Sequence, residues 1–254
     1  MLELREVAKS FSGIPAVDGV SFSVQAGEVA GYLGPNGSGK STTLKMITGI
    51  MEMTSGQILF GGQPIQRDWI AYKRCMGYVP EEPHLYAHLS ALEYLTMVGQ
   101  LRELPPKSTR EKIAGLLRLF SLHGDRHSPI SNYSKGMRQK VLWAAALLHD
   151  PEVLLLDEPF SGLDVGSALV MRSLIQELAA RGKVVLLSSH ELEAVEQVSS
   201  RVIILHRGKV VADDSIERLR TLMALPRLED IFSRLAVEQD PAAVSRAIAD
   251  LLRS

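Results

Sequence analysis

The feature that constrains this chain most is a glycine-rich stretch at residues 34–42. It fits the G-x-x-x-x-G-K-[ST] pattern of a phosphate-binding loop, and its residues are Gly34, Pro35, Asn36, Gly37, Ser38, Gly39, Lys40, Ser41 and Thr42. An apolar strand is predicted at residues 28–33 and a helix at residues 40–50, so the loop joins a strand to a helix. The alternative, a purely structural turn, does not explain this context.

Each part of the loop has a physical reason to bind phosphate. Glycines let backbone N–H groups converge on phosphate oxygens, and the N-terminus of the following helix adds a positive dipole end. Lys40 is expected to reach the β- and γ-phosphates of a nucleotide, and the Ser41 hydroxyl is placed to bind Mg²⁺.

Buried strands alternate with helices in the second half of the chain. Apolar runs at residues 153–156 and 184–187 are followed by helical patterns at residues 166–180 and 191–199. Such alternation predicts a mostly parallel sheet covered by helices, so the fold class is α/β.

Three other regions complete the predicted architecture. Short half-buried strands at residues 2–8 and 22–24 predict a small antiparallel sheet at the N-terminal end. Helical patterns between residues 89 and 149 predict an inserted helical subdomain, and a hairpin is expected to turn at Arg207–Gly208.

Two acidic residues follow the buried strand at residues 153–156. Asp157 would hold Mg²⁺ through water, and Glu158 could polarise a water molecule that attacks the γ-phosphate. Taken alone, two adjacent acids after a strand are equally consistent with a solvated loop. The phosphate loop upstream favours the functional interpretation.

Composition excludes several classes of protein. The 254 residues are 46% hydrophobic and carry a formal net charge of -1, which argues against a nucleic-acid partner because nucleic-acid binders usually show a basic excess. The longest apolar run, residues 141–148, is far shorter than the ~20 residues of a membrane-spanning helix. The first residues lack the apolar segment of a signal peptide, so we expect a cytoplasmic protein.

From Leu2 to Asp213 the chain resembles the ATP-binding subunits of ABC transporters. Ser134, Lys135 and Gly136 lie at the position of the LSGGQ signature, where Lys135 replaces a glycine, and Asp164 ends a match to the D-loop. The resemblance implies that these residues contact the ATP that is bound to the other subunit of a dimer. For Lys135, an exposed lysine without a role is equally consistent with the sequence. Phe11 lies where the family keeps an adenine-stacking aromatic, with a core phenylalanine as the alternative.

Two further matches surround the γ-phosphate. His190 follows the strand at residues 184–187 and matches the switch histidine of the family, and such strand ends are where ligands gather in open α/β sheets. Glu81 lies where the family usually has a glutamine that touches Mg²⁺ or the attacking water. Glu81 can supply an oxygen ligand to the metal, but it adds a negative charge beside phosphate.

The resemblance implies a P-loop NTPase core that hydrolyses ATP with Mg²⁺. Glu158, His190 and Lys40 are the expected catalytic residues, and Ser41, Asp157 and Glu81 the expected metal ligands. Because each motif occurs once, a homodimer or a pair of related subunits would sandwich two ATP molecules. Hydrolysis would drive transport, and the signature variant favours export, through a separate membrane permease.

Location, alternatives and domain limits follow from the same resemblance. The chain would sit on the inner face of the cell membrane. One alternative is a soluble ABC ATPase that acts on a macromolecular assembly. Another is an interaction protein that binds ATP without hydrolysis, which the presence of Glu158 and His190 argues against. We expect an ATP-binding domain at residues 1–220, with its helical insertion at about 82–150, and a short helical extension at residues 221–254.

Overall fold

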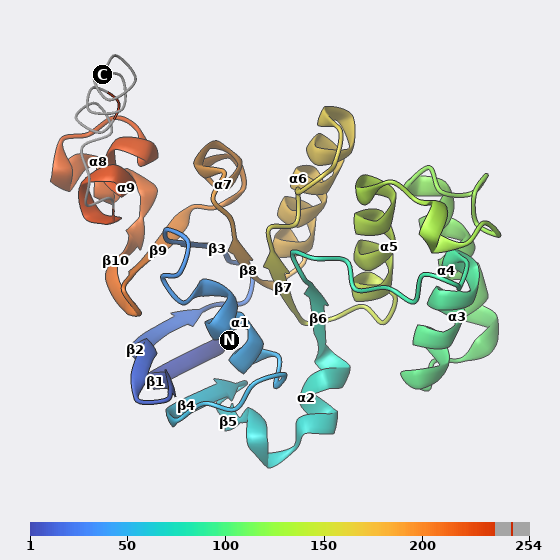
Figure 1. The fold of residues 1–254 in the computed structure, drawn as a ribbon, viewed down its shortest axis with the longest axis horizontal. Helices are drawn as coiled ribbons and strands as arrows, with labels where there is room; N and C mark the ends of the chain where they lie inside the picture. The colour runs from blue at the N-terminus through green and yellow to red at the C-terminus, as the bar shows by residue number, and fades with distance from the viewer. Residues whose placement is uncertain (237–244, 246–254) are drawn as a thin grey trace, which may run out of the picture.

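A computed structural model describes residues 1–236 and residue 245, and Figure 1 shows two sheets with helices around them. The larger sheet has six strands. In spatial order they are β10 (Lys209–Ser215), β9 (Arg201–His206), β3 (Val29–Leu33), β8 (Val184–Ser188), β7 (Val153–Asp157) and β6 (Met76–Val79). All neighbours pair in parallel except β10, which pairs antiparallel with β9 across the predicted hairpin. The predicted α/β fold with a mostly parallel sheet is confirmed.

Both faces of this sheet are buried, which explains why its strands are continuous apolar runs. In β7, Val153 and Leu155 pack into one hydrophobic cluster, whereas Leu154 and Leu156 pack into another on the opposite face. Successive side chains of a strand point to opposite faces, so one apolar strand contributes to two cores.

The smaller sheet is antiparallel and covers one face of the larger one, as predicted. Its strands, in spatial order, are β2 (Ile14–Val24), β1 (Leu2–Phe11), β4 (Ser55–Phe60) and β5 (Gln63–Pro64). Leu2, Leu4 and Ile58 pack with Tyr32 of the larger sheet and with the buried face of the helix that follows the phosphate loop. This core holds the base of the loop in place.

The helices surround the larger sheet (Figure 1). They are α1 (Lys40–Ile47), α2 (Trp69–Cys75), α3 (Ala91–Leu101), α4 (Pro106–Leu119), α5 (Lys135–Leu147), α6 (Val165–Ala180), α7 (Leu192–Val198), α8 (Ile216–Met223) and α9 (Leu228–Ala236). Two short 3₁₀ turns, η1 (Ile65–Arg67) and η2 (Ile130–Asn132), complete the described elements. Helices α3, α4 and α5 follow one another between β6 and β7 and lie together on one side of the molecule.

Local signals determine where several helices begin. A capping box is present at the start of α3, where the Ser90 side chain accepts from the backbone N–H of Glu93 and the Glu93 carboxylate accepts from the Ser90 backbone N–H. Helix α4 begins at Pro106, because a proline is well suited to the first helical position.

Among the α-helices of the described residues, one was not predicted by the sequence patterns. Helix α2 is only seven residues long, and Tyr72 is its single buried residue, so it has no apolar periodicity to detect. Asp68 caps its N-terminus by accepting a hydrogen bond of 2.9 Å from the backbone N–H of Ala71.

The C-terminal helices pack against the main core. They contribute to the hydrophobic cluster that also contains Leu154 and Leu156 of β7. The contributing residues are Ile216 and Leu219 of α8 and Leu228 and Ile231 of α9. The rest of the expected helical extension, at residues 237–244 and 246–254, lies outside the described residues. Within the described part of the chain, no helix is long and apolar enough to cross a membrane.

Candidate active site

A cavity of about 330 Å³ opens at the carboxyl ends of the parallel strands, where ligands bind in open α/β sheets. It is lined by Ala16, Asn36, Gly37, Gly39, Lys40, Ser41, Thr42, Glu81, Asp157, Glu158 and His190. Every lining residue except Ala16 was predicted from the sequence. The strand order β3-β8-β7-β6 explains the grouping, because the segments after these four strands supply most of the cavity wall.

The phosphate loop is built so that no side chain can fill it. Gly39 has a φ of 108°, and a Cβ at this position would lie 2.5 Å from the carbonyl oxygen of Ala16. A Cβ on Gly34 would lie 2.4 Å from the Ser38 hydroxyl. Gly39 is also the N-cap residue of α1 and makes no side-chain cap hydrogen bond. The first N–H groups of α1 therefore lack a capping side chain, as an anion-binding helix N-terminus requires.

Lys40 is held within its own loop. The residue is 9% exposed, and its Nζ donates to the carbonyl oxygens of Gly34 at 2.6 Å and Pro35 at 3.2 Å. Burial lowers the pKa of Lys40, while the nearby charges of Glu158 and Asp157 oppose that shift. Gly34 and Pro35 thus orient the lysine and do not line the cavity themselves.

Two serines hold the paired carboxylates. The Ser188 hydroxyl donates to Oδ1 of Asp157, and the Ser189 hydroxyl donates to Oε2 of Glu158 at 2.9 Å. His190 places its Nδ1 2.8 Å from Oε1 of Glu158. Burial raises the pKa of Glu158, and its hydrogen bonds with His190 and Ser189 act in the opposite direction.

Ser188 and Ser189 belong to no sequence motif that predicted a functional role. The available signal was two hydroxyl residues directly after a buried strand, in the position that Asp157 and Glu158 occupy after theirs. What makes them partners is the pairing of β7 with β8, which sets Asp157 opposite Ser188.

The donors around the cavity fit Mg²⁺ bound together with a nucleotide. Among the described residues, no three His, Cys, Asp or Glu side chains are grouped closely enough to hold a metal ion alone. Ser41 and Asp157 nevertheless line the same cavity as the phosphate loop, and Glu81 adds a third oxygen donor to its wall. Mg²⁺ is typically held by one or two protein carboxylates together with phosphate oxygens and water, so a sparse oxygen set suits it.

The signature residues lie elsewhere. Ser134 is the N-cap of α5, and its side chain accepts from the backbone N–H of Met137 at 3.2 Å. Lys135 Nζ donates to the Ser161 hydroxyl at 2.7 Å, so Lys135 joins the signature to the D-loop. Asp164 caps α6 by accepting from the backbone N–H of Ser167 at 2.8 Å. None of these residues lines the cavity.

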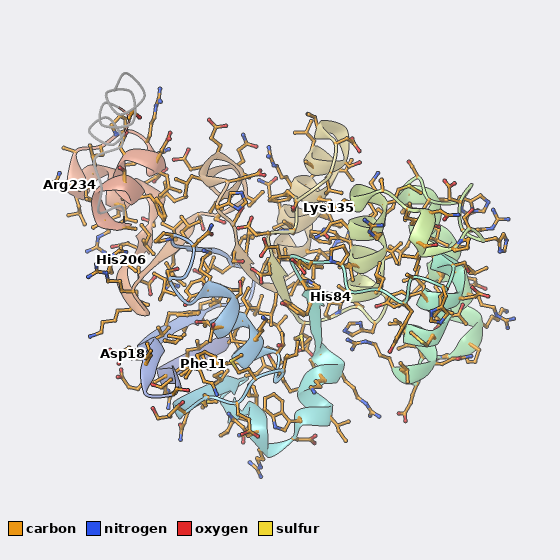
Figure 2. All side chains as sticks on the ribbon, in the orientation of Figure 1. Phe11, Asp18, His84, Lys135, His206 and Arg234 are labelled. Atoms are coloured by element: carbon orange, nitrogen blue, oxygen red, sulfur yellow. The ribbon has the colours of Figure 1, made fainter. Side chains whose placement is uncertain are left out.

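The signature and the D-loop also pack directly against each other. A Cβ added to Gly136 would lie 2.5 Å from the carbonyl oxygen of Gly162, so the backbones of these two segments are in close contact. Figure 2 shows Lys135 beside α6, whereas Phe11 lies on the antiparallel sheet. Within one chain, the predicted nucleotide contacts therefore fall into separate groups.

Phe11 is a surface residue. It is 46% exposed, which excludes the alternative of a core phenylalanine. The ammonium group of Lys9 lies 5.4 Å from the centre of its ring. An exposed aromatic face of this kind is available for stacking on a planar ligand.

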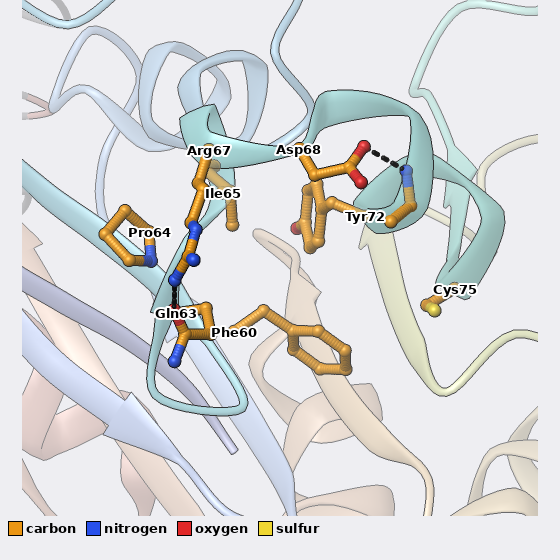
Figure 3. Close-up of a pocket in the computed structure, with 9 residues that line it drawn as sticks. Phe60, Gln63, Pro64, Ile65, Arg67, Asp68, Tyr72 and Cys75 are labelled. Atoms are coloured by element: carbon orange, nitrogen blue, oxygen red, sulfur yellow. Dashed lines mark hydrogen bonds between the residues drawn. The ribbon is translucent and has the colours of Figure 1, made fainter.

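A second cavity, of about 420 Å³, lies beneath α2 and is shown in Figure 3. Its wall is mainly apolar and includes Phe60, Ile65 and Tyr72, with Arg67 bound to Gln63. None of the predicted site residues lines this cavity, and it has no phosphate loop or paired carboxylates. The chemistry of a nucleotide site therefore belongs to the smaller cavity.

Comparison with known proteins agrees with this geometry. The profile of the ABC transporter family matches residues 17–161. YhcH of Bacillus subtilis, an uncharacterized ABC transporter ATP-binding protein, is 39% identical over 212 residues, covering 83% of this chain and 68% of YhcH. NatA of the same organism, an ABC transporter ATP-binding protein, is 35% identical over 224 residues, covering 86% of this chain and 91% of NatA.

A solved structure extends the comparison to three dimensions. The ATP-binding subunit of an ABC transporter superposes with a TM-score of 0.87 at 32% identity, covering 92% of this chain and 99% of that chain. The phosphate loop, the buried carboxylates and the fold thus lead to the same family. The chain belongs to the ATP-binding subunits of ABC transporters and is an ATPase of that family.

Proposed function

We propose that this chain binds ATP and Mg²⁺ in the cavity at the strand ends and hydrolyses the ATP to drive transport through a separate membrane permease. One observation carries the proposal. The phosphate loop with Lys40, the buried acids Asp157 and Glu158, and His190 all line one cavity. Phosphoryl transfer depends mainly on positioning and on charge around the γ-phosphate, and these groups supply both.

Each group has a distinct role in the proposed reaction. The loop N–H groups and Lys40 hold the phosphates, while Ser41 and Asp157 would hold Mg²⁺, which neutralises phosphate charge when bound. Glu158 accepts a proton from water as the water oxygen bonds to the γ-phosphorus and the bond to the β-phosphate oxygen breaks, releasing ADP and phosphate. A buried carboxylate with a raised pKa is suited to accept that proton.

His190 and Glu81 act at the edge of this centre. The contact between His190 Nδ1 and Glu158 Oε1 lets His190 orient the base, and its exposed ring lines the cavity that would hold the γ-phosphate. Glu81 follows β6 and faces the same cavity, so it would respond to Mg²⁺ and transmit that response to the helices after it.

We infer that the complete site needs a second subunit. Ser134, Lys135, Gly136 and Asp164 lie outside the cavity of their own chain. The N-terminus of α5, capped by Ser134, would present a positive dipole end to the ATP of another copy. Phe11 would stack on the adenine ring. The assembly would then be a homodimer, or a pair with a related subunit, that sandwiches two ATP molecules.

Coupling to a permease would place the chain on the inner face of the cell membrane. The variant signature favours export. NatA and YhcH are both named as ABC transporter ATP-binding proteins, which supports transport over a soluble ABC ATPase that acts on a macromolecular assembly. We also propose a division into residues 1–220, with the helical insertion at about 82–150, and an extension at residues 221–254.

Two substitutions test the proposed chemistry. Glu158→Gln should leave ATP binding intact, slow hydrolysis by about 100-fold or more and trap a dimer in the presence of ATP. Lys40→Ala should abolish nucleotide binding or hydrolysis. Steady-state phosphate release measures hydrolysis, equilibrium binding of a fluorescent ATP analogue measures nucleotide affinity, and light scattering detects the dimer. Hydrolysis at the wild-type rate in Glu158→Gln would refute the assignment of the base.

Two further experiments test the assembly and the partner. Ser134→Arg should abolish hydrolysis while each chain retains its ATP affinity, and unchanged hydrolysis would refute the composite site. Co-purification of the chain from detergent-solubilised membranes with an integral membrane protein is expected. Recovery with a soluble assembly and without a membrane protein would favour the alternative.

A further inference from the structure

The two serines after β8 mirror the two acids after β7. Strands β7 and β8 pair in parallel, and Asp157 lies opposite Ser188 in the register. The next residues, Glu158 and Ser189, therefore leave the sheet side by side. Ser188 bonds to the carboxylate of Asp157 and Ser189 to that of Glu158, so each acid has its own serine.

The Ser189 hydroxyl makes two hydrogen bonds, and it donates to Glu158 because an ionised carboxylate can only accept. The backbone N–H of Glu191 donates to Ser189 Oγ at 3.0 Å, which occupies an acceptor site of the hydroxyl. A hydroxyl has a single proton to donate. That proton is directed at Oε2 of Glu158, 2.9 Å away.

Glu158 needs this support because its backbone leaves the strand abruptly. Its φ is 47°, in the left-handed region that non-glycine residues seldom adopt, and its N–H donates to the Ser188 carbonyl oxygen at 3.0 Å. Beyond the backbone, glutamate has three rotatable side-chain bonds. The position of the carboxylate consequently depends on the groups that contact its two oxygens.

Those two contacts differ in kind. Ser189 is 1% exposed and lies directly after a central strand, so the position of its donor hydroxyl is well defined. The His190 side chain is 66% exposed and contacts the other oxygen, Oε1. A buried serine can therefore hold Oε2 in one position, while Oε1 contacts the exposed ring of His190, which lines the cavity together with Glu158.

We propose that Ser189 is a positioning residue for ATP hydrolysis, which holds Oε2 of Glu158 so that Oε1 faces the attacking water. The proposal rests on the proposed function, in which Glu158 is the base. Ser189 acts through Glu158 and makes no contact with ATP itself. Its loss should therefore change the rate of the chemical step and leave nucleotide affinity unchanged.

The test compares Ser189→Ala with Ser189→Thr and a matched control. Without the hydroxyl, kcat should fall about tenfold while KM and the Kd for ATP stay within about twofold of wild type. Thr retains a hydroxyl and should restore most of kcat. Ser199→Ala is the control, because Ser199 is also buried at 6% exposure and its Oγ has no hydrogen-bond partner among the described residues. Thermal unfolding shows that each variant is folded.

A double-mutant cycle with Glu158→Gln separates this inference from the proposed function. If Ser189 acts through Glu158, adding Ser189→Ala to Glu158→Gln should leave the residual rate unchanged. Two results would overturn the inference: wild-type kcat in Ser189→Ala, or the same tenfold loss in the Glu158→Gln background. Wild-type hydrolysis by Glu158→Gln would instead refute the assignment of Glu158 as the base in the proposed function, whatever Ser189→Ala does.

Discussion

His149 should make the folded protein sensitive to mild acid. The residue follows α5, and its Nε2 lies 3.0 Å from the carbonyl oxygen of Met76, so the neutral ring donates there. Nδ1 is buried and has no partner among the described residues. Burial, followed by the charge of Arg102, lowers the pKa of His149 from 6.5 to about 4.

The sign and size of the effect follow from proton linkage. The unfolded chain gains a proton on this ring as the pH falls through 6.5, whereas the folded chain resists it until the pH approaches 4. The unfolded state therefore binds more protons in this window, and the free energy of unfolding decreases as the pH is lowered. Between pH 7.5 and pH 5 the loss from this one group amounts to about 2 kcal/mol in the free energy of unfolding.

The variant His149→Gln isolates this contribution. Its side-chain amide can still donate to the Met76 carbonyl but cannot take a proton. Urea unfolding, followed by tryptophan fluorescence, to which the fully buried Trp143 contributes, is measured at both pH values for wild type and variant. The wild type should lose about 2 kcal/mol more than the variant over this interval. The exposed His123, changed to Gln, is the control and should behave as wild type. Equal losses in wild type and His149→Gln would refute the reasoning.

Three further substitutions test the loop and the packing. Gly39→Ala should lower the free energy of unfolding by about 1–3 kcal/mol and weaken nucleotide binding, because the φ of 108° and the nearby Ala16 carbonyl oxygen disfavour a Cβ. Unchanged results in thermal unfolding and nucleotide titration would contradict this. Arg201→Met should lower the free energy of unfolding in urea by about 1–3 kcal/mol, since two hydrogen bonds to the Asp213 carboxylate are lost. The same urea midpoint as wild type would contradict this prediction. Ile113→Ala should cost about 2–5 kcal/mol by the same assay, because the fully buried side chain leaves a cavity, and a loss below about 1 kcal/mol would show that the helices collapse around it.

Most of the fold and of the cavity wall could be predicted from contiguous residues. The phosphate loop needs glycines at defined positions, and the strands β7 and β8 need apolar residues on both faces, so both requirements are written in short stretches of sequence. The helix α2 escaped prediction because a seven-residue helix with one buried side chain carries no periodic signal. Phe11 could be assigned to the surface only from the tertiary structure, because its exposure depends on what packs against the end of β1.

By itself the sequence determined that strand, loop and helix form a phosphate cradle, and that Asp157 and Glu158 end a buried strand. Those properties depend on backbone conformation and burial within a few residues. Only the tertiary structure decided that Ser188 and Ser189 hold the two acids, and that the signature lies outside the cavity of its own chain. The physical reason is strand order: β8 lies between β3 and β7, although long segments separate them in sequence, and side-chain partners across a sheet follow from that spatial order.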